Sequence, residues 1–157
     1  MSTISMLGRR AALAIFGLAA GGLMLAGVAV AATSPIANQD GVAIKGFDTV
    51  AYWTDGKAVK GNPLFKHSWN GAEWQFASAA NRDKFAMAPE KYAPEYGGYC
   101  AWGMTVARPV QPDPTQWRIV DGKLYLQSGE GALNNWTKDV PAAIAKGMEN
   151  WPKVKAQ

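Results

Sequence analysis

The 157-residue sequence contains one cysteine, Cys100, and one histidine, His67. A single cysteine cannot form an intramolecular disulfide, and the chain has no C-x-x-C motif, no H-E-x-x-H motif and no phosphate-binding glycine loop. The carboxylates are scattered singly along the chain. These absences give no support to a disulfide scaffold, a zincin-type protease or a nucleotide-hydrolysing enzyme. We therefore expect a protein without catalytic activity.

The sequence also lacks any run of basic residues. Its formal net charge is +4, from 16 Lys and Arg against 12 Asp and Glu, and these charges are spread along the chain. Proteins that bind nucleic acid usually concentrate positive charge in a patch or stripe. We therefore expect no nucleic-acid partner, and a metal ion or another protein instead.

Residues 1–31 have the pattern of an export signal. Arg9 and Arg10 precede residues 11–28, which carry no charge, and an A-x-A cleavage pattern ends at Ala31. We predict a signal peptide over residues 1–31 and a periplasmic or secreted mature protein; the paired arginines also fit the twin-arginine route. The apolar run is long enough for an uncleaved anchor, which would be the only membrane contact.

Asn70-Gly71 separates two short alternating segments, residues 64–69 and 72–77. This dipeptide predicts a hairpin, because a type I′ turn needs positive φ at both central residues. The predicted pairs are Trp69 with Ala72, His67 with Trp74, and Phe65 with Phe76. Alternation then places His67 on the apolar face of the hairpin.

Asp121-Gly122 predicts a second hairpin, with an apolar face made of Trp117, Ile119, Leu124 and Leu126. We expect the two hairpins to share one sheet. Short helices separate from the hairpins indicate an α+β fold, with a small antiparallel sheet built from two hairpins and packed against several short helices. Residues 32–40 read as a linker, and residues 41–155 as the domain with a C-terminal helical extension.

Cap and period signals predict the helices. Asp48 is placed to cap residues 49–53, and Ser78 to cap residues 79–88, whose Phe85 would turn back onto the sheet. Two further helices are predicted over residues 132–138 and 142–151, with Pro141 in the first turn of the second. The side chains expected to cover the sheet from these helices are Trp136, Ile144, Met148 and Trp151.

The run FASAANRDKFAMAPEKY, followed by YGGYCAWG, resembles the YHS-domain family, in particular its secreted bacterial branch. GFDTVAYWTDGKAVKGNPLFKHSWNG, further upstream, resembles the same branch. The resemblance implies a small module suspected of binding metal, with copper as the candidate. Metal-binding forms carry two cysteines as F-C-S-x-x-C, and here Ala77 and Asn81 stand at both cysteine positions. Any metal site must therefore be built from other residues.

Cys100, His67 and Met104 are the candidate metal ligands. A thiolate, an imidazole and a thioether suit Cu(I) or a blue-copper-like centre, and Met104 follows Cys100 by about one helical turn. Three alternatives stay open. In the first, Cys100 and His67 are ordinary residues of the core. In the second, the domain has lost its metal and acts as a protein-binding or structural module. In the third, Cys100 and His67 are the nucleophile and base of a thiol enzyme.

Overall fold

The computed structural model describes residues 32–157, so the predicted signal peptide and the alternative anchor lie outside the described residues. Within residues 32–157, no helix is both long enough and apolar enough to cross a membrane. The elements in chain order are β1 (Asn38–Gln39), β2 (Val42–Ala43), η1 (Ile44–Gly46), α1 (Ala51–Thr54), β3 (Asn62–Trp69), β4 (Ala72–Phe76), α2 (Ala79–Met87), α3 (Pro89–Tyr92), η2 (Glu95–Gly98), α4 (Ala101–Met104), β5 (Asp113–Val120), β6 (Lys123–Gln127), α5 (Glu130–Trp136) and α6 (Val140–Lys155).

The strands of the described part of the chain form two separate sheets, one of four strands in the order β1-β2-β4-β3 and one formed by β5 and β6. The predicted α+β class is confirmed, but the expectation that both hairpins share one sheet is wrong. β2 pairs in parallel with β4 through Val42 and Glu73, so it occupies the edge of β4 that faces away from β3. β5 pairs with β6 in a sheet of its own.

The register of the first hairpin agrees with the prediction near its turn and departs from it further away. Trp69 pairs with Ala72 and His67 pairs with Trp74. Phe76, however, pairs with Asn62 and not with Phe65, because an irregularity interrupts the ladder between residues 62 and 66. Pro63 lies in this stretch and has no backbone N–H for the ladder, which accounts for the interruption.

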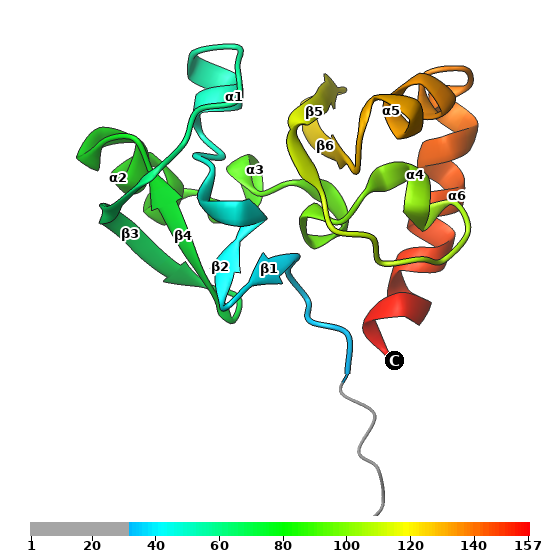
Figure 1. Ribbon diagram of the computed structural model, residues 1–157, viewed down its shortest axis with the longest axis horizontal. Coiled ribbons are helices and arrows are strands. Elements are labelled where there is room, and N and C mark those ends of the chain that lie inside the picture. The colour runs from blue at the N-terminus through cyan, green and yellow to red at the C-terminus, as the bar shows by residue number, and fades with distance from the viewer. Residues whose placement is uncertain (1–31) are drawn as a thin grey trace, which may run out of the picture. The chain divides into compact units, whose positions relative to one another are not determined.

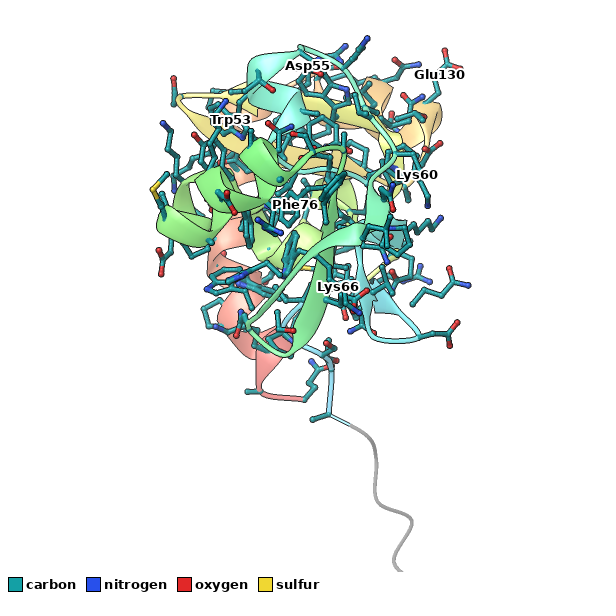
Figure 2. All side chains as sticks on the ribbon, turned by 90° about the vertical axis from the view of Figure 1, so that its left-hand side faces the viewer. Trp53, Asp55, Lys60, Lys66, Phe76 and Glu130 are labelled. Carbon is teal, nitrogen blue, oxygen red and sulfur yellow. The ribbon has the colours of Figure 1, made fainter. Side chains whose placement is uncertain are left out.

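Helix α2 forms as its cap residue predicts. The Ser78 hydroxyl accepts a hydrogen bond from the backbone N–H of Asn81 at 3.1 Å. Phe85 is fully buried, and its ring centroid lies 5.1 Å from those of both Trp74 and Phe76. Figure 2 looks at the molecule from this side and shows Phe76 in the interior, with Lys66 and Asp55 further out.

The β5–β6 hairpin lies between two hydrophobic clusters. Leu124 and Leu126 belong to the first cluster, together with Phe85 of α2, whereas Tyr125 belongs to the second cluster, together with Trp136 of α5. The alternation of side chains along β6 therefore sends neighbouring residues into different clusters. Figure 1 shows β5 and β6 between β3, β4 and α2 on one side and α4, α5 and α6 on the other.

Helix α6 begins where Pro141 predicts, with Asp139 as its cap, and Ile144 and Trp151 pack against the second cluster as partly buried residues. Its buried residues are Ala143, Gly147, Asn150 and Val154. The expectation that Met148 covers the sheet is wrong, since 57% of that residue is exposed. A β-carbon at Gly147 would overlap the ring of Tyr96, so only glycine allows α6 to pack this closely against η2.

Residues 32–40, read from sequence as a linker, contain β1 and supply two core residues. Ile36 is 2% exposed and Ala37 is fully buried. The backbone N–H of Ala37 donates to the carbonyl oxygen of Gly97 at 2.8 Å, and the Tyr99 hydroxyl donates to that of Ser34 at 3.1 Å. These contacts hold the segment against η2 as part of the fold.

Candidate functional site

The turn from β4 into α2 brings the backbone N–H of Ala77, an exposed residue, and the buried side chain of Asn81 to one acceptor. β4 ends at Phe76, and the capped first turn of α2 places the Asn81 side chain back toward the strand end. Asn81 is 9% exposed, and its side-chain amide donates a hydrogen bond inward. The acceptor is the carboxylate of Asp48, which reaches this point from the turn before α1.

Asp48 is fully buried, and both of its carboxylate oxygens are used as acceptors. Oδ1 accepts from the backbone N–H groups of Val50 at 2.9 Å and Ala51 at 3.3 Å. Oδ2 accepts from the backbone N–H of Ala77 and from Nδ2 of Asn81, each at 2.8 Å. A carboxylate has about four acceptor positions, so this group has none left for a further ligand.

Tyr52 of α1 connects this helix to β5. Its hydroxyl donates to the carbonyl oxygen of Pro114 at 2.7 Å. Burial raises the pKa of Tyr52 well above its usual range, and the negative charges of Asp113 and Asp48 raise it further. Tyr52 is therefore a neutral donor that ties α1 to the second hairpin.

Cys100 lies at the start of α4 and is 1% exposed. Its Sγ accepts from the backbone N–H of Gly103 at 3.4 Å and lies 3.5 Å from Oε1 of Gln127, to which the thiol donates. The same Oε1 accepts from the backbone N–H of Trp102 at 3.0 Å. Gln127 is fully buried, and within residues 32–157 its Nε2 has no hydrogen-bond partner.

Sequence reasoning missed Gln127, which is the side chain that holds the thiol. The only available signal was its place two residues after Tyr125 on β6, which puts both side chains on one face of the strand. A glutamine near the end of a strand more often faces solvent, so this signal is weak.

His67 and Met104, the other two candidate ligands, contact different clusters. His67 is half-buried on β3 and contacts the ring of Phe85 edge-on, with centroids 6.0 Å apart. Met104 is fully buried in the second cluster at the end of α4, and its backbone N–H donates to the Cys100 carbonyl at 3.1 Å. The backbones of Met104 and Cys100 are thus in direct contact, whereas His67 lies on the other side of the β5–β6 hairpin from both.

Residues 50–96 match the family model of the YHS domain. This part of the chain is a YHS domain. No curated protein and no solved structure matches the chain significantly. The matched residues run from the turn before α1 to the start of η2, so the YHS domain includes the first hairpin, α2 and α3.

The YHS domain contains both positions at which metal-binding forms of the family carry cysteine. Neither residue present there fits a metal: Ala77 has no donor atom in its side chain, and the Asn81 amide nitrogen is a hydrogen-bond donor to Asp48. The Asp48 carboxylate is saturated by N–H groups. Across residues 32–157, moreover, no three His, Cys, Asp or Glu side chains gather in a group able to hold a metal ion.

Two of the three predicted ligands lie outside the YHS domain. His67 falls within residues 50–96, whereas Cys100 and Met104 follow the end of the match. The metal set of Cys100, His67 and Met104 stays a prediction. The thiol-enzyme alternative likewise needs His67 beside Cys100, and the hydrogen-bond partners of the thiol are Gln127 and Gly103.

Proposed function

We propose that this chain is an exported, non-catalytic YHS-domain protein that works by binding a partner and needs no metal at the position of the two family cysteines. The observation that carries this proposal is the Asp48 carboxylate with its four hydrogen bonds. A metal ion coordinated by two cysteines would join the end of a strand to the first turn of the next helix. Asp48 makes the same connection here through Ala77 and Asn81.

The hydrogen bonds also explain why the site would reject a metal ion. A buried carboxylate that accepts from four N–H groups would have to lose those bonds before it could bind a cation, and each buried donor left unpaired costs about 1–3 kcal/mol. Ala77 adds no ligand in return. The export part of the proposal rests on the charge and cleavage pattern of residues 1–31.

The experiment is a comparison of metal dependence between the natural chain and a variant with both cysteines restored, Ala77→Cys with Asn81→Cys. For the natural chain we expect no bound metal after purification. Its melting temperature should be the same in the presence of a chelator, Zn²⁺ or Cu(I). The restored variant should bind a soft metal and melt at a higher temperature with it than without it. Stoichiometric metal in the natural chain that disappears in Asp48→Asn would contradict the proposal.

A copper site at Cys100 is the second candidate, favoured by one observation. Cys100 and Met104 are both buried and lie at the two ends of the single turn of α4. Thiolate and thioether sulfur are ligands that Cu(I) prefers. Such a site would require the thiol of Cys100 to exchange its contact with Gln127 for the metal.

The test of this candidate is an anaerobic Cu(I) titration of the natural chain, of Cys100→Ser and of Met104→Leu. Tight stoichiometric binding that is lost in Cys100→Ser and weakened in Met104→Leu would establish copper binding at α4. A titration with His67→Asn then decides whether the histidine takes part. Equal binding by the natural chain and Cys100→Ser would dismiss this candidate.

A further inference from the structure

A groove of about 500 Å³ opens between the YHS domain and the C-terminal helix α6. Trp69 at the end of β3, Glu90 of α3, and Glu95 and Tyr96 of η2 line it from the YHS domain, and Trp151 and Lys155 line it from α6. Its volume falls within the range of small-molecule sites, about 300–1,000 Å³. Neither Cys100 nor Asp48 is among its lining residues, so the groove is separate from the sites described above.

Trp151 is held in place by other aromatic rings. Its ring centroid lies 6.4 Å from that of Tyr96 and 6.1 Å from that of Tyr99. Trp69, the second indole of the groove, lies 5.8 Å from both Trp74 and Phe85. Both indoles are half-buried, so they are fixed by packing and still reach the groove.

The floor of the groove is also fixed before any ligand arrives. Tyr96 has a φ of 55° and Gly97 a φ of 62°, so two successive residues adopt the left-handed conformation. A non-glycine residue in this region costs about 1–3 kcal/mol, and it persists because neighbouring contacts impose it. Here a β-carbon at Gly97 would overlap the carbonyl oxygen of Pro35, and the Tyr96 hydroxyl donates to the Ile144 carbonyl at 3.1 Å.

The chain already places a cation on one of these rings. Nζ of Lys155 lies 5.6 Å from the centroid of Trp151, within the distance of a cation–π contact. Lys155 is exposed and sits in the last turn of α6, so its ammonium can leave the ring at little cost. The contact indicates that the exposed face of Trp151 attracts positive charge.

Two carboxylates at the groove carry the negative charge that a bound cation needs. Glu90 is exposed at the start of α3, and Glu95 lies half-buried at the start of η2, where it is 3.6 Å from the ammonium of Lys123. Two indole rings with two carboxylates nearby are the chemistry that recognises an organic cation. Among residues 32–157, Lys155 is the one positive side chain that lines the groove, and a ligand cation would replace it on Trp151.

We propose that this groove binds a small organic cation, an amine or a quaternary ammonium compound, between Trp69 and Trp151, with Glu90 and Glu95 supplying the opposite charge. The inference rests on the proposed function, since it names the site and ligand class through which the module binds. Lys155 acts as a built-in competitor that occupies the Trp151 face when the groove is empty of ligand.

The test compares choline with 3,3-dimethylbutan-1-ol, which has the same shape and no charge, by calorimetry and tryptophan fluorescence on the full chain. We expect choline to bind at least tenfold more tightly than the neutral alcohol. Glu90→Gln should weaken choline binding about threefold, and Lys155→Met should strengthen it by a similar factor. Trp151→Leu should abolish it, whereas Trp102→Leu, which changes an exposed tryptophan outside the groove, should leave it unchanged.

Equal affinity for choline and the alcohol, or no choline binding up to about 10 mM, would overturn the inference. If Trp151→Leu does not fold, the choline affinities of Glu90→Gln and Lys155→Met test the inference instead. Both residues are exposed, so these two variants are expected to fold. An unchanged affinity in both of these variants would likewise overturn it. The metal titrations above test the proposed function separately: the chain can prove independent of metal whether or not choline binds.

Discussion

The carboxylate of Asp48 lies 2.8 Å from the side-chain nitrogen of Asn81, a residue 33 positions later in the chain. The bond connects the turn before α1 to the first turn of α2 at a fully buried carboxylate. Asn81 stands at a position where the family resemblance places a metal-binding cysteine. Ordinary hydrogen bonds thus make a connection that a metal ion is expected to make in other members of the family.

Asp48→Asn should strongly destabilise the fold. An asparagine side chain has one oxygen acceptor, so its amide nitrogen would replace either Oδ1 or Oδ2 and would face the N–H groups that donate to that oxygen, which leaves buried donors unpaired. We expect a loss of about 2–4 kcal/mol in the free energy of unfolding, measured in urea.

The matched control is Asp55→Asn, which makes the same chemical change at an exposed aspartate. Its effect should stay within about 0.5 kcal/mol. Similar losses for Asp48→Asn and Asp55→Asn would mean that the buried network contributes little to stability.

The sequence predicted those parts of the fold that depend on short stretches of chain. Asn70-Gly71 gave the turn of the first hairpin, and Ser78 gave the start of α2, because hairpin turns and caps are decided within a few residues. Asp48 was predicted only as a cap. Its second oxygen reaches Asn81, and no local pattern indicates a contact over that separation.

The candidate metal set could not be judged from sequence for the same reason. His67 was correctly placed on the face of β3 that meets the apolar core, where it packs on Phe85. Whether that face also meets Cys100 depends on the β5–β6 hairpin, which lies between the two clusters. Gln127 comes to the thiol only through this tertiary arrangement.

Gly97→Ala should be much more damaging than Gly56→Ala. The two glycines have nearly the same φ, 62° and 64°, so the conformational penalty of a side chain, about 1 kcal/mol, is common to both. At Gly56 a β-carbon would meet no atom of residues 32–157 within 4 Å, whereas at Gly97 it would overlap the carbonyl oxygen of Pro35.

We expect Gly97→Ala to cost at least about 2 kcal/mol more than Gly56→Ala in urea unfolding, because residues 32–37 must move away from η2. This difference measures the clash alone. Equal losses in the two variants would show that the N-terminal segment is not held against Gly97 in solution.

Phe85→Ala should remove the ring around which the first cluster packs. Phe85 is fully buried and lies 5.1 Å from both Trp74 and Phe76. Replacing a buried phenylalanine by alanine typically costs about 3–5 kcal/mol. Met87→Ala, in the same helix at a residue that is 79% exposed, should change the free energy of unfolding by less than about 0.5 kcal/mol. Nearly equal losses of unfolding free energy in Phe85→Ala and Met87→Ala would mean that Phe85 is not part of the core.

The buried tyrosines should make the protein lose stability at alkaline pH. Burial raises the pKa of Tyr125 to about 12, and the nearby charges of Glu95 and Asp121 contribute. Burial also raises the pKa of Tyr52 and Tyr96. An unfolded tyrosine has a pKa near 10, so above that pH the unfolded state releases protons that the folded state keeps.

The stabilisation from these neutral phenols is therefore complete below about pH 10 and declines as the pH rises toward about 12. Urea unfolding from about pH 8 to about pH 11 should show this decline in the natural chain, and Tyr125→Phe should show a shallower decline. Tyr125→Phe removes one buried phenol and, with it, a negative charge that raises the pKa of Tyr96 at high pH, so the comparison measures both contributions of Tyr125. Identical slopes for the two proteins would mean that Tyr125 ionises as readily in the folded chain as in the unfolded one.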